Sequence, residues 1–340
     1  MTICRRTPEI LNFDGKISTL DFPKAKGGLN GLISTTAGTI WYVDWSERVN
    51  IILNSWHNTF KKTIGICYNE KSRKIITSST DFSIKLWNSA NHYEEEVDFF
   101  IANKVCTCMD TEKSIMAGGF TDGTIRVYEL INNTLLGYIE VRNAEDPNKK
   151  DAISSIKFFS NGLNLLVGTF SGRVYMTRIH QHIPLKMSMT PIADTQFSIT
   201  SLSLSPFDHR YVFLCASKNN LIKVWGRKNL YRSNNEKAEE DLMTSIDQME
   251  FYLLDNYNSQ SSSKKPKKFL SSEIGHAGNL EPTNETCIAK FSTIEPNVYL
   301  YANFGHPKIC FRNYKEHVEL REVGLLDLPT CFQVSNVEDV

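Results

Sequence analysis

The 340-residue sequence has no excess of charge of either sign, because 38 Lys and Arg residues balance 38 Asp and Glu residues. Nucleic-acid-binding domains usually carry a basic excess, so this balance argues against a general nucleic-acid binder. The chain also lacks any apolar run near the roughly 20 residues of a membrane-spanning helix, so no membrane insertion is expected. Its eight cysteines form no Cys-x-x-Cys pair. This spacing fits neither a zinc site nor a disulfide framework and favours a reducing, cytoplasmic compartment.

Catalytic and cofactor-binding motifs are missing as well. The sequence contains no G-x-x-x-x-G-K-[ST] phosphate loop, no G-x-G-x-x-G after a strand and no G-x-S-x-G nucleophile turn. His180 and His182 lie close together in RIHQH, but no neighbouring residues complete a metal site. We therefore expect a protein that is not an enzyme, with no cofactor, no bound metal and no small-molecule substrate.

What the sequence does contain is a repeated unit, in which a turn of small or polar residues precedes an alternating strand pattern. The turns read TAGTIWYVD, TDFSIKLWN, TDGTIRVYE, FSGRVYMTR, KNNLIKVWG and GHPKICFRN. The aliphatic residues that open the six strands are Ile40, Ile84, Ile125, Val174, Ile222 and Ile309. They are separated by 44, 41, 49, 48 and 87 residues. The first four intervals are typical of one propeller blade, which takes roughly 40–45 residues.

Each unit also holds four short strands separated by turn residues, as in TIGICYN, RKIITSS, SIKLWN and EEEVDFFI of the second unit. Four antiparallel strands per repeat are the composition of a propeller blade. We therefore predict an all-β propeller with six recognisable blades, whose ring is incomplete or interrupted by an insertion. TAGTIWYVDWSE is then the turn and third strand of the first blade, and Trp41 and Trp45 are packing residues.

These units resemble WD40 repeats, most closely in the second. There, His57, Thr77, Asp81 and Trp87 match the polar residues that hydrogen-bond one another within a WD40 blade. A buried indole N–H and a buried imidazole both need partners, which a hydroxyl and a carboxylate supply. The third and fourth units have lost this pattern in part. Tyr128 replaces the tryptophan in the third unit, and we assign Met176 to that position in the fourth.

We divide the chain into three parts. Residues 1–227 hold five blades, residues 228–284 an irregular connection, and residues 285–340 a further blade and the first strand of the next. The spacing of Leu242, Ile246, Met249 and Leu253 predicts an amphipathic helix in the connection. A basic Ser- and Lys-rich loop follows it. Because the last strand has no blade to join, we expect the chain to be a fragment of a longer protein.

A closer resemblance covers most of residues 10–340. TTAGTIWYVDWSE in the first unit, TDGTIRVYEL, NNLIKVWGRKNLYRSN and the terminal LPTCFQVS are similar, in this order, to the large centriole and basal-body WD-repeat family with tandem propellers. The resemblance implies a scaffold in the microtubule wall of centrioles that supports centriole integrity and cilium assembly. It also implies localisation at the cytoskeleton, centrosome or cilium basal body, with tubulin or centriolar wall proteins as partners. The alternative is an adaptor of another cytosolic complex, such as a ubiquitin-ligase receptor or a trafficking coat.

Partners of propellers usually contact the loops that join strands at one face, which here include Asn58–Lys62, Asn143–Asp151 and Thr190–Phe197. The loop Asn143–Asp151 and the lysine cluster of the connection are our candidate partner surfaces. Their candidate residues are Asp146, Lys149, Lys150, Lys264, Lys265, Lys267 and Lys268. An enzyme acting in the central channel is disfavoured, since the expected inner strands TIGICYN, KVCTCMD, AISSIKFF and SITSLSLS are chiefly apolar or small.

Overall fold

The structure is a computed structural model of the chain. It describes residues 16–21, 30–44, 49–55, 62–88, 94–100, 104–143, 145–159, 164–179, 186–187, 192–207, 212–227, 251–259, 286–303 and 306–325. The chain ends 1–15 and 326–340, with most of the predicted connection, lie outside these residues. His57 and the lysines at positions 264, 265, 267 and 268 also lie outside them.

The described residues form six antiparallel sheets of consecutive strands, which we number as blades 1–6. Blade 1 contains β1 (Ile17–Asp21), β2 (Asn30–Thr35), β3 (Thr39–Asp44) and β4 (Val49–Ser55). Blade 2 contains β5 (Thr63–Asn69), β6 (Lys74–Ser79), β7 (Ser83–Asn88) and β8 (Glu94–Phe100). Blade 3 contains β9 (Cys106–Glu112), β10 (Ile115–Phe120), β11 (Thr124–Glu129) and β12 (Thr134–Glu140).

The remaining three blades repeat this meander. Blade 4 contains β13 (Ile153–Phe158), β14 (Asn164–Thr169), β15 (Arg173–Arg178), the short β16 (Lys186–Met187) and β17 (Ala193–Asp194), which also pairs with β15. Blade 5 contains β18 (Ile199–Leu204), β19 (Phe213–Ser217), β20 (Leu221–Arg227) and β21 (Phe251–Asn258). Blade 6 contains β22 (Cys287–Phe291), β23 (Val298–Asn303), β24 (Lys308–Asn313) and β25 (Val318–Gly324).

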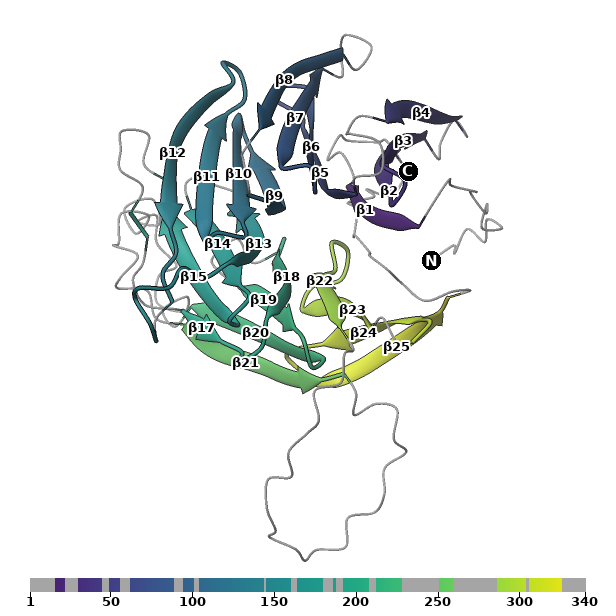
Figure 1. Ribbon diagram of the computed structural model, residues 1–340. Helices are drawn as coiled ribbons and strands as arrows, with labels where there is room; N and C mark the ends of the chain where they lie inside the picture. The colour runs from purple at the N-terminus through teal and green to yellow at the C-terminus, as the bar shows by residue number, and fades with distance from the viewer. Residues whose placement is uncertain are drawn as a thin grey trace, which may run out of the picture.

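The sheets follow one another around a central axis, with the first strand of each innermost (Figure 1). These inner strands contact in the order β1, β5, β9, β13, β18, β22. Among the described strands, none pairs blade 6 with blade 1. The arrangement confirms the predicted all-β propeller, while closure of the ring concerns residues outside the described ranges and stays a prediction.

Blades pack on one another through apolar residues that alternate along their strands. Ile125 and Val127 of blade 3, for example, share one buried cluster with Ile153, Val167 and Tyr175 of blade 4. Similar clusters join blades 4 and 5 and blades 5 and 6. The two-residue period of each strand therefore places one side chain of every pair against a neighbouring blade.

The repeated Asp-x-Ser/Thr pattern closes the tight turns between the second and third strands of blades 2 and 3. The Asp81 carboxylate accepts hydrogen bonds from the backbone N–H of Ser83 at 3.0 Å and from its hydroxyl at 2.6 Å. Asp122 makes the same two bonds to Thr124 at 3.1 and 2.6 Å. A side-chain acceptor two residues before a donor closes such a turn locally, so each hairpin forms largely independently of its surroundings.

One prediction about the connection is wrong. The amphipathic helix does not include Leu253, because residues Phe251–Asn258 form β21, the fourth strand of blade 5. Leu254 and Tyr257 pack against the core between blades 5 and 6, and the Asp255 carboxylate is hydrogen-bonded to Arg312 of blade 6. These long-range contacts outweigh the helical spacing of the local sequence. Leu242, Ile246 and Met249 lie outside the described residues.

The described cysteines serve as packing residues. All six are unpaired, and five of them are buried. Burial raises the pKa of the Cys215 and Cys287 thiols to about 12, so they stay protonated at neutral pH. Within the described ranges, no three His, Cys, Asp or Glu residues are grouped so that they could hold a metal ion. The same ranges contain no helix of the length and apolarity required to cross a membrane.

Candidate interaction surface

Blade 2 contains one bond of the predicted polar set, while His57 lies outside the described residues. The Trp87 indole N–H donates a hydrogen bond to the Thr77 hydroxyl at 3.0 Å across β6 and β7, and both side chains are buried. Asp81 lies in the adjoining turn, where it holds Ser83. This contact ties the outer part of the blade to its second strand and has no exposed reactive group, so its role is structural.

The position of Trp87 varies from blade to blade. In each blade, one residue of the third strand pairs with the residue that lies four positions before the end of the second strand. These equivalent residues are Val43, Trp87, Tyr128, Thr177, Trp225 and Arg312. The assignment of Met176 to this position is therefore wrong by one residue, because Met176 pairs with Leu166 and matches Leu86. A count from the turn alone does not fix the register of a strand.

Replacing Trp87 by phenylalanine is expected to lower the free energy of unfolding by about 1 kcal/mol, because a buried hydrogen-bond donor is lost while most of the ring packing remains. A double-mutant cycle with Thr77→Val, followed by urea denaturation, isolates the pair. We expect a coupling energy of about 0.5–1.5 kcal/mol. Strictly additive effects of the two substitutions would show that the hydrogen bond contributes nothing.

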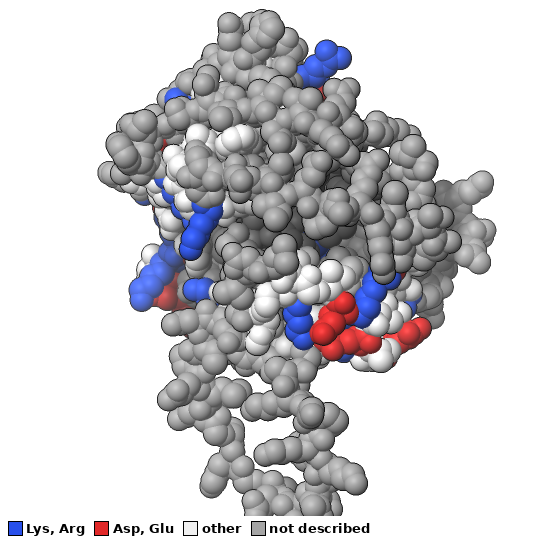
Figure 2. Space-filling view, turned by 90° about the vertical axis from the view of Figure 1, so that its right-hand side faces the viewer, with Lys and Arg blue, Asp and Glu red and all other residues white. Residues whose placement is uncertain are grey.

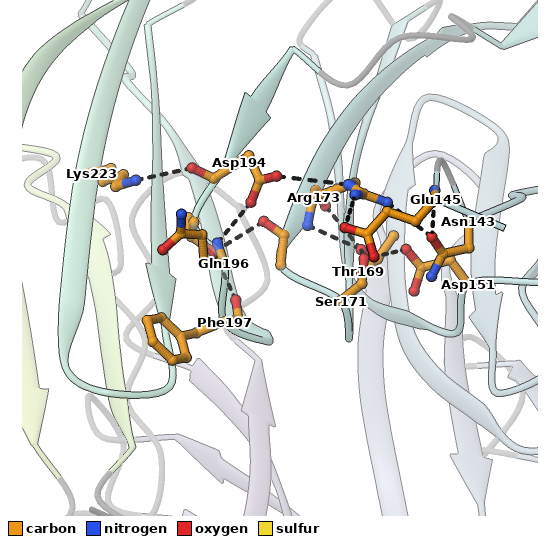
Figure 3. A network of polar contacts seen from close by, with 12 residues as sticks. Asn143, Glu145, Asp151, Thr169, Ser171, Arg173, Asp194, Gln196, Phe197 and Lys223 are labelled. Carbon is orange, nitrogen blue, oxygen red and sulfur yellow. Dashed lines mark hydrogen bonds and ion pairs between the residues drawn. The ribbon is translucent and has the colours of Figure 1, made fainter. Parts of the chain in front are cut away.

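At one end of the blades, two loops between successive blades meet around Arg173, the first residue of β15 (Figure 3). The guanidinium donates hydrogen bonds to Asn143 Oδ1 at 3.0 Å and to Glu145 Oε1 at 2.8 Å. Its Nε lies 3.7 Å from Asp194 Oδ2, at the end of the short strand β17 in the connection that leads to blade 5. The Arg173 side chain is only 10% exposed. One buried cation therefore bridges loops that are about 50 residues apart in the sequence.

Neighbouring side chains stabilise the charged form of Arg173. Burial alone disfavours a charged guanidinium, but the nearby Tyr175, Glu145 and Asp194 outweigh this effect and raise the pKa of Arg173 above its ordinary value. Glu145 and Asp194 themselves are 82% and 48% exposed. The bridge is thus buried on the arginine side and open to a partner on the carboxylate side.

Further bonds hold each loop to the turn between β14 and β15. The Ser171 hydroxyl donates to Asp151, and the backbone N–H of Thr195 donates to Gly172 O at 2.9 Å. Gly172 has φ +94°, and a Cβ there would lie 2.6 Å from the backbone N and O of Phe197. Only glycine allows this approach without displacing the loop. The two loops are consequently fixed to the same rigid hairpin.

We call Asn143, residues 145–151, Phe170 and residues 193–197 the Arg173 loop surface. Phe170 is 47% exposed in its turn and offers an apolar contact beside the charged residues. Lys149 and Asp146 form an exposed ion pair at 3.5 Å, and Lys150 contacts Glu140 at 2.6 Å. The surface therefore combines one aromatic side chain with charges of both signs, as in the polar rims of protein–protein interfaces.

The predicted loop residues Asp146, Lys149 and Lys150 all lie on this surface. Glu145 and Asp194 also lie on it, within the predicted loops Asn143–Asp151 and Thr190–Phe197, whereas Arg173 and Phe170, which organise and extend it, were not predicted from the sequence. One indication was available: blades 1–3 have Thr39, Ser83 or Thr124 where blade 4 has arginine. Blades 5 and 6 also depart from this pattern, with Leu221 and Lys308 at the same position, so the arginine by itself does not identify the surface.

Elsewhere on the molecule, the face shown in Figure 2 carries Lys and Arg beside Asp and Glu rather than a field of one sign among its described residues. In blade 6, Lys308 bonds Glu322 at 2.8 Å and Arg321 bonds Glu295 at 2.6 Å. Such pairs contribute little to stability. Because their opposite charges cancel, they create no strong local electrostatic potential.

Six antiparallel sheets around one axis, five of four strands and one of five, with Asp-x-Ser/Thr turns and a Thr–Trp bond within a blade, define a WD40-type β-propeller. No protein-family model matches the chain. Among characterised proteins, it is similar to WD repeat-containing protein 90. The identity to the Xenopus tropicalis protein is 26% over 229 residues, which cover 63% of this chain and 12% of that protein. The identity to the mouse protein is 27% over 172 residues, which cover 48% and 8%. The resemblance to a large WD-repeat protein is thereby confirmed, and the matched part is a small fraction of these relatives' length.

Solved structures show the same fold at low sequence identity. The β-propeller domain of Cps50 (Swd1) from Myceliophteria thermophila superposes with a TM-score of 0.66, at 12% identity, over 94% of this chain and 89% of that one. The computationally designed Ika8 protein gives a TM-score of 0.55 at 16% identity, over 95% and 92%. At these identities the matches show the β-propeller fold.

Proposed function

We propose that this chain is a non-enzymatic scaffold of the centriole or basal-body wall and that it recruits protein partners through the Arg173 loop surface. The observation that carries this proposal is the buried Arg173 bridge, which holds two blade-connecting loops in one rigid arrangement. Prearranged loops lose little conformational entropy on binding, so they suit recognition of a folded partner. The similarity to WD repeat-containing protein 90 and to the centriole WD-repeat family supports the location.

The mixed charges of the surface favour a structured protein partner, such as a centriolar wall protein, over a simple acidic tail. A tail of one sign, like the acidic tails of tubulin, is attracted best by a patch of the opposite sign. On the Arg173 loop surface, the ammonium of Lys149 already has a carboxylate within 3.5 Å. Direct binding of tubulin would therefore depend on residues outside the described ranges, including the predicted lysine cluster.

The test is localisation of the tagged chain in dividing, ciliated cells that carry centriole and axoneme markers. We expect signal along the centriole wall for the native chain. A diffuse signal, with the chain co-purifying in another soluble complex, would overturn the location and favour an adaptor of that complex. Restoring the flanking sequence of a longer relative tests whether targeting needs further domains.

Arg173→Met should separate the role of the surface from that of the fold. Because Glu145 and Asp194 are exposed and regain water, we expect a loss of only about 1–2 kcal/mol in unfolding free energy. We also expect faster amide hydrogen exchange at residues 145–151 and 193–197, and loss of centriolar signal. Lys315→Met is the control, since Lys315 is an exposed cation in a turn of blade 6, outside this surface. Equal localisation of both variants and the native chain would exclude this surface.

A further inference from the structure

The innermost strands carry charged residues at one level around the central axis of the propeller. In every blade, one inner-strand residue pairs with the residue three before the end of the second strand. These six equivalent residues are Asp21, Cys67, Asp110, Lys157, Ser203 and Lys290. We call them the channel belt. The inner strands were expected to be chiefly apolar or small. That expectation is wrong at this level, where four of the six residues are aspartate or lysine.

The belt has two chemically different halves. Since the inner strands follow one another in blade order, Asp21, Cys67 and Asp110 are consecutive, and so are Lys157, Ser203 and Lys290. Lys157 and Asp110, which meet where the halves join, bond at 2.6 Å and keep 28% and 18% of their side chains exposed. The belt is thus deep in the molecule and still reached by solvent. One half presents carboxylates and the other presents ammonium and hydroxyl groups.

Most belt groups already have partners. Asp21 accepts a hydrogen bond from the backbone N–H of Tyr68 at 2.9 Å, and Asp110 accepts one from Phe158 at 2.7 Å. Ser203 Oγ accepts a hydrogen bond from the N–H of Phe291 at 3.1 Å, which leaves its hydroxyl proton to be donated. Burial raises the pKa of the Cys67 thiol, with Asp21 and Asp110 adding to the effect, so this group is neutral.

Lys290 differs from Lys157 in the partners of its ammonium group. Among the described residues, its ammonium has one hydrogen bond, to Leu202 O at 3.4 Å, and no carboxylate partner. Burial and the charge of Lys157 lower the pKa of Lys290 to about 7, and the attraction of Asp110 and Asp21 does not compensate. Lys157 differs because the adjacent Asp110 outweighs burial and raises its pKa. A desolvated cation without a counterion, beside a second cation, is a position that an anion stabilises.

We propose that Lys157, Ser203 and Lys290 form a binding site for a small tetrahedral oxyanion, either free sulfate or phosphate or the phosphate group of a small phosphorylated molecule. The oxyanion would accept hydrogen bonds from the two ammonium groups and the hydroxyl between them. Such charge-assisted bonds to an ion in a partly desolvated channel are stronger than those at an open surface. This site is independent of the proposed scaffold function, because none of its residues belongs to the Arg173 loop surface.

Calorimetric titration of the full chain with sulfate, at constant ionic strength set by chloride, tests the proposal. Sulfate does not titrate near neutral pH, so any pH dependence belongs to the protein. We expect binding at pH 6.5, and a loss of affinity of about tenfold or more from pH 7 to pH 9 as Lys290 loses its proton. Parallel titrations with phosphate and glycerol phosphate decide whether the site accepts a free ion only.

Variants make the test specific. Lys290→Met should lower the affinity at least tenfold, while Lys290→Arg should retain binding and remove its pH dependence, because arginine stays charged. Lys315→Met is the matched control, an exposed lysine in a turn of the same blade. Absence of sulfate binding at tens of millimolar, or equal affinity of the native chain, Lys290→Met and Lys315→Met, would overturn the proposal. Thermal unfolding confirms that each variant is folded.

Discussion

Replacing Asp255 by alanine is expected to lower the free energy of unfolding by about 3–5 kcal/mol, because it leaves a buried arginine without its counterion. Asp255 in β21 is 2% exposed at its side chain and accepts hydrogen bonds from Arg312 Nε at 3.0 Å and Nη2 at 3.3 Å. His317 Nδ1 and the Tyr299 hydroxyl also contact its carboxylate, at 2.8 and 3.3 Å. This carboxylate therefore links blade 5 to three residues of blade 6.

The expected loss of unfolding free energy is large because Arg312 is a buried cation. It occupies the position that tryptophan has in blade 2, and its side chain is 9% exposed. Burial disfavours its charge, but the hydrogen bonds and charge of Asp255 outweigh burial and raise the pKa of Arg312. Without Asp255, the guanidinium keeps its contact with the Tyr257 ring at 4.0 Å but has no carboxylate.

Urea denaturation monitored by tryptophan fluorescence measures this effect, since Trp225 lies in the same blade as Asp255. The control is Glu322→Ala, which removes an exposed ion pair of blade 6 and should change the unfolding free energy by less than about 1 kcal/mol. If both substitutions shift the urea midpoint equally, the blade 5–6 contact does not depend on the buried pair. Asp255→Asn should fall between the two, because it keeps some hydrogen bonds and loses the charge.

Replacing Gly172 by alanine is expected to detach the loop of residues 193–197 from blade 4. A non-glycine residue at φ +94° is strained by roughly 1–3 kcal/mol. The added Cβ would also collide with the Phe197 backbone, whose nearest atoms lie at 2.6 Å. Backbone atoms cannot turn aside as a flexible side chain can, so the loop must move. The bonds from Thr195 to Gly172 O at 2.9 and 3.0 Å are then lost.

Hydrogen exchange followed by mass spectrometry locates this change. We expect amide protection to fall at residues 193–197 by tenfold or more, with smaller changes at the inner strands, because local opening affects loops before the core. Gly324→Ala is the control, since nothing lies within 4 Å of a Cβ built there. Unchanged protection in Gly172→Ala would mean that this turn does not position the loop. If the loop surface binds the partner, centriolar localisation should also be lost in this variant.

The buried Arg173 and Arg312 show how degenerate blades in this chain remain joined. In blade 2, the Trp87–Thr77 bond lies within one sheet, whereas Arg312 connects two sheets and Arg173 connects two loops to a hairpin. Blades that lack the usual internal bond therefore use polar contacts to neighbouring segments. Substitutions at the two arginines should affect the arrangement of blades and loops more than the folding of single hairpins.

The sequence by itself determined the repeated hairpins, because their information is local. Turn residues two positions apart, as in Asp81–Ser83 and Asp122–Thr124, close each hairpin, and the two-residue apolar period decides which side of a strand is buried. These features sufficed to predict an all-β propeller of six blades and to place Asp146, Lys149 and Lys150 on an exposed loop.

Only the tertiary structure decided which distant residues meet. Strand β21 pairs with β20, and its Asp255 bonds Arg312, which is 57 residues away; these contacts override a helical apolar spacing. Arg173 gains its role from loops on both sides of blade 4, and the channel belt arises because successive inner strands bring Lys157, Ser203 and Lys290 to one level. Such contacts depend on the register and order of whole blades, which the local pattern of a strand does not specify.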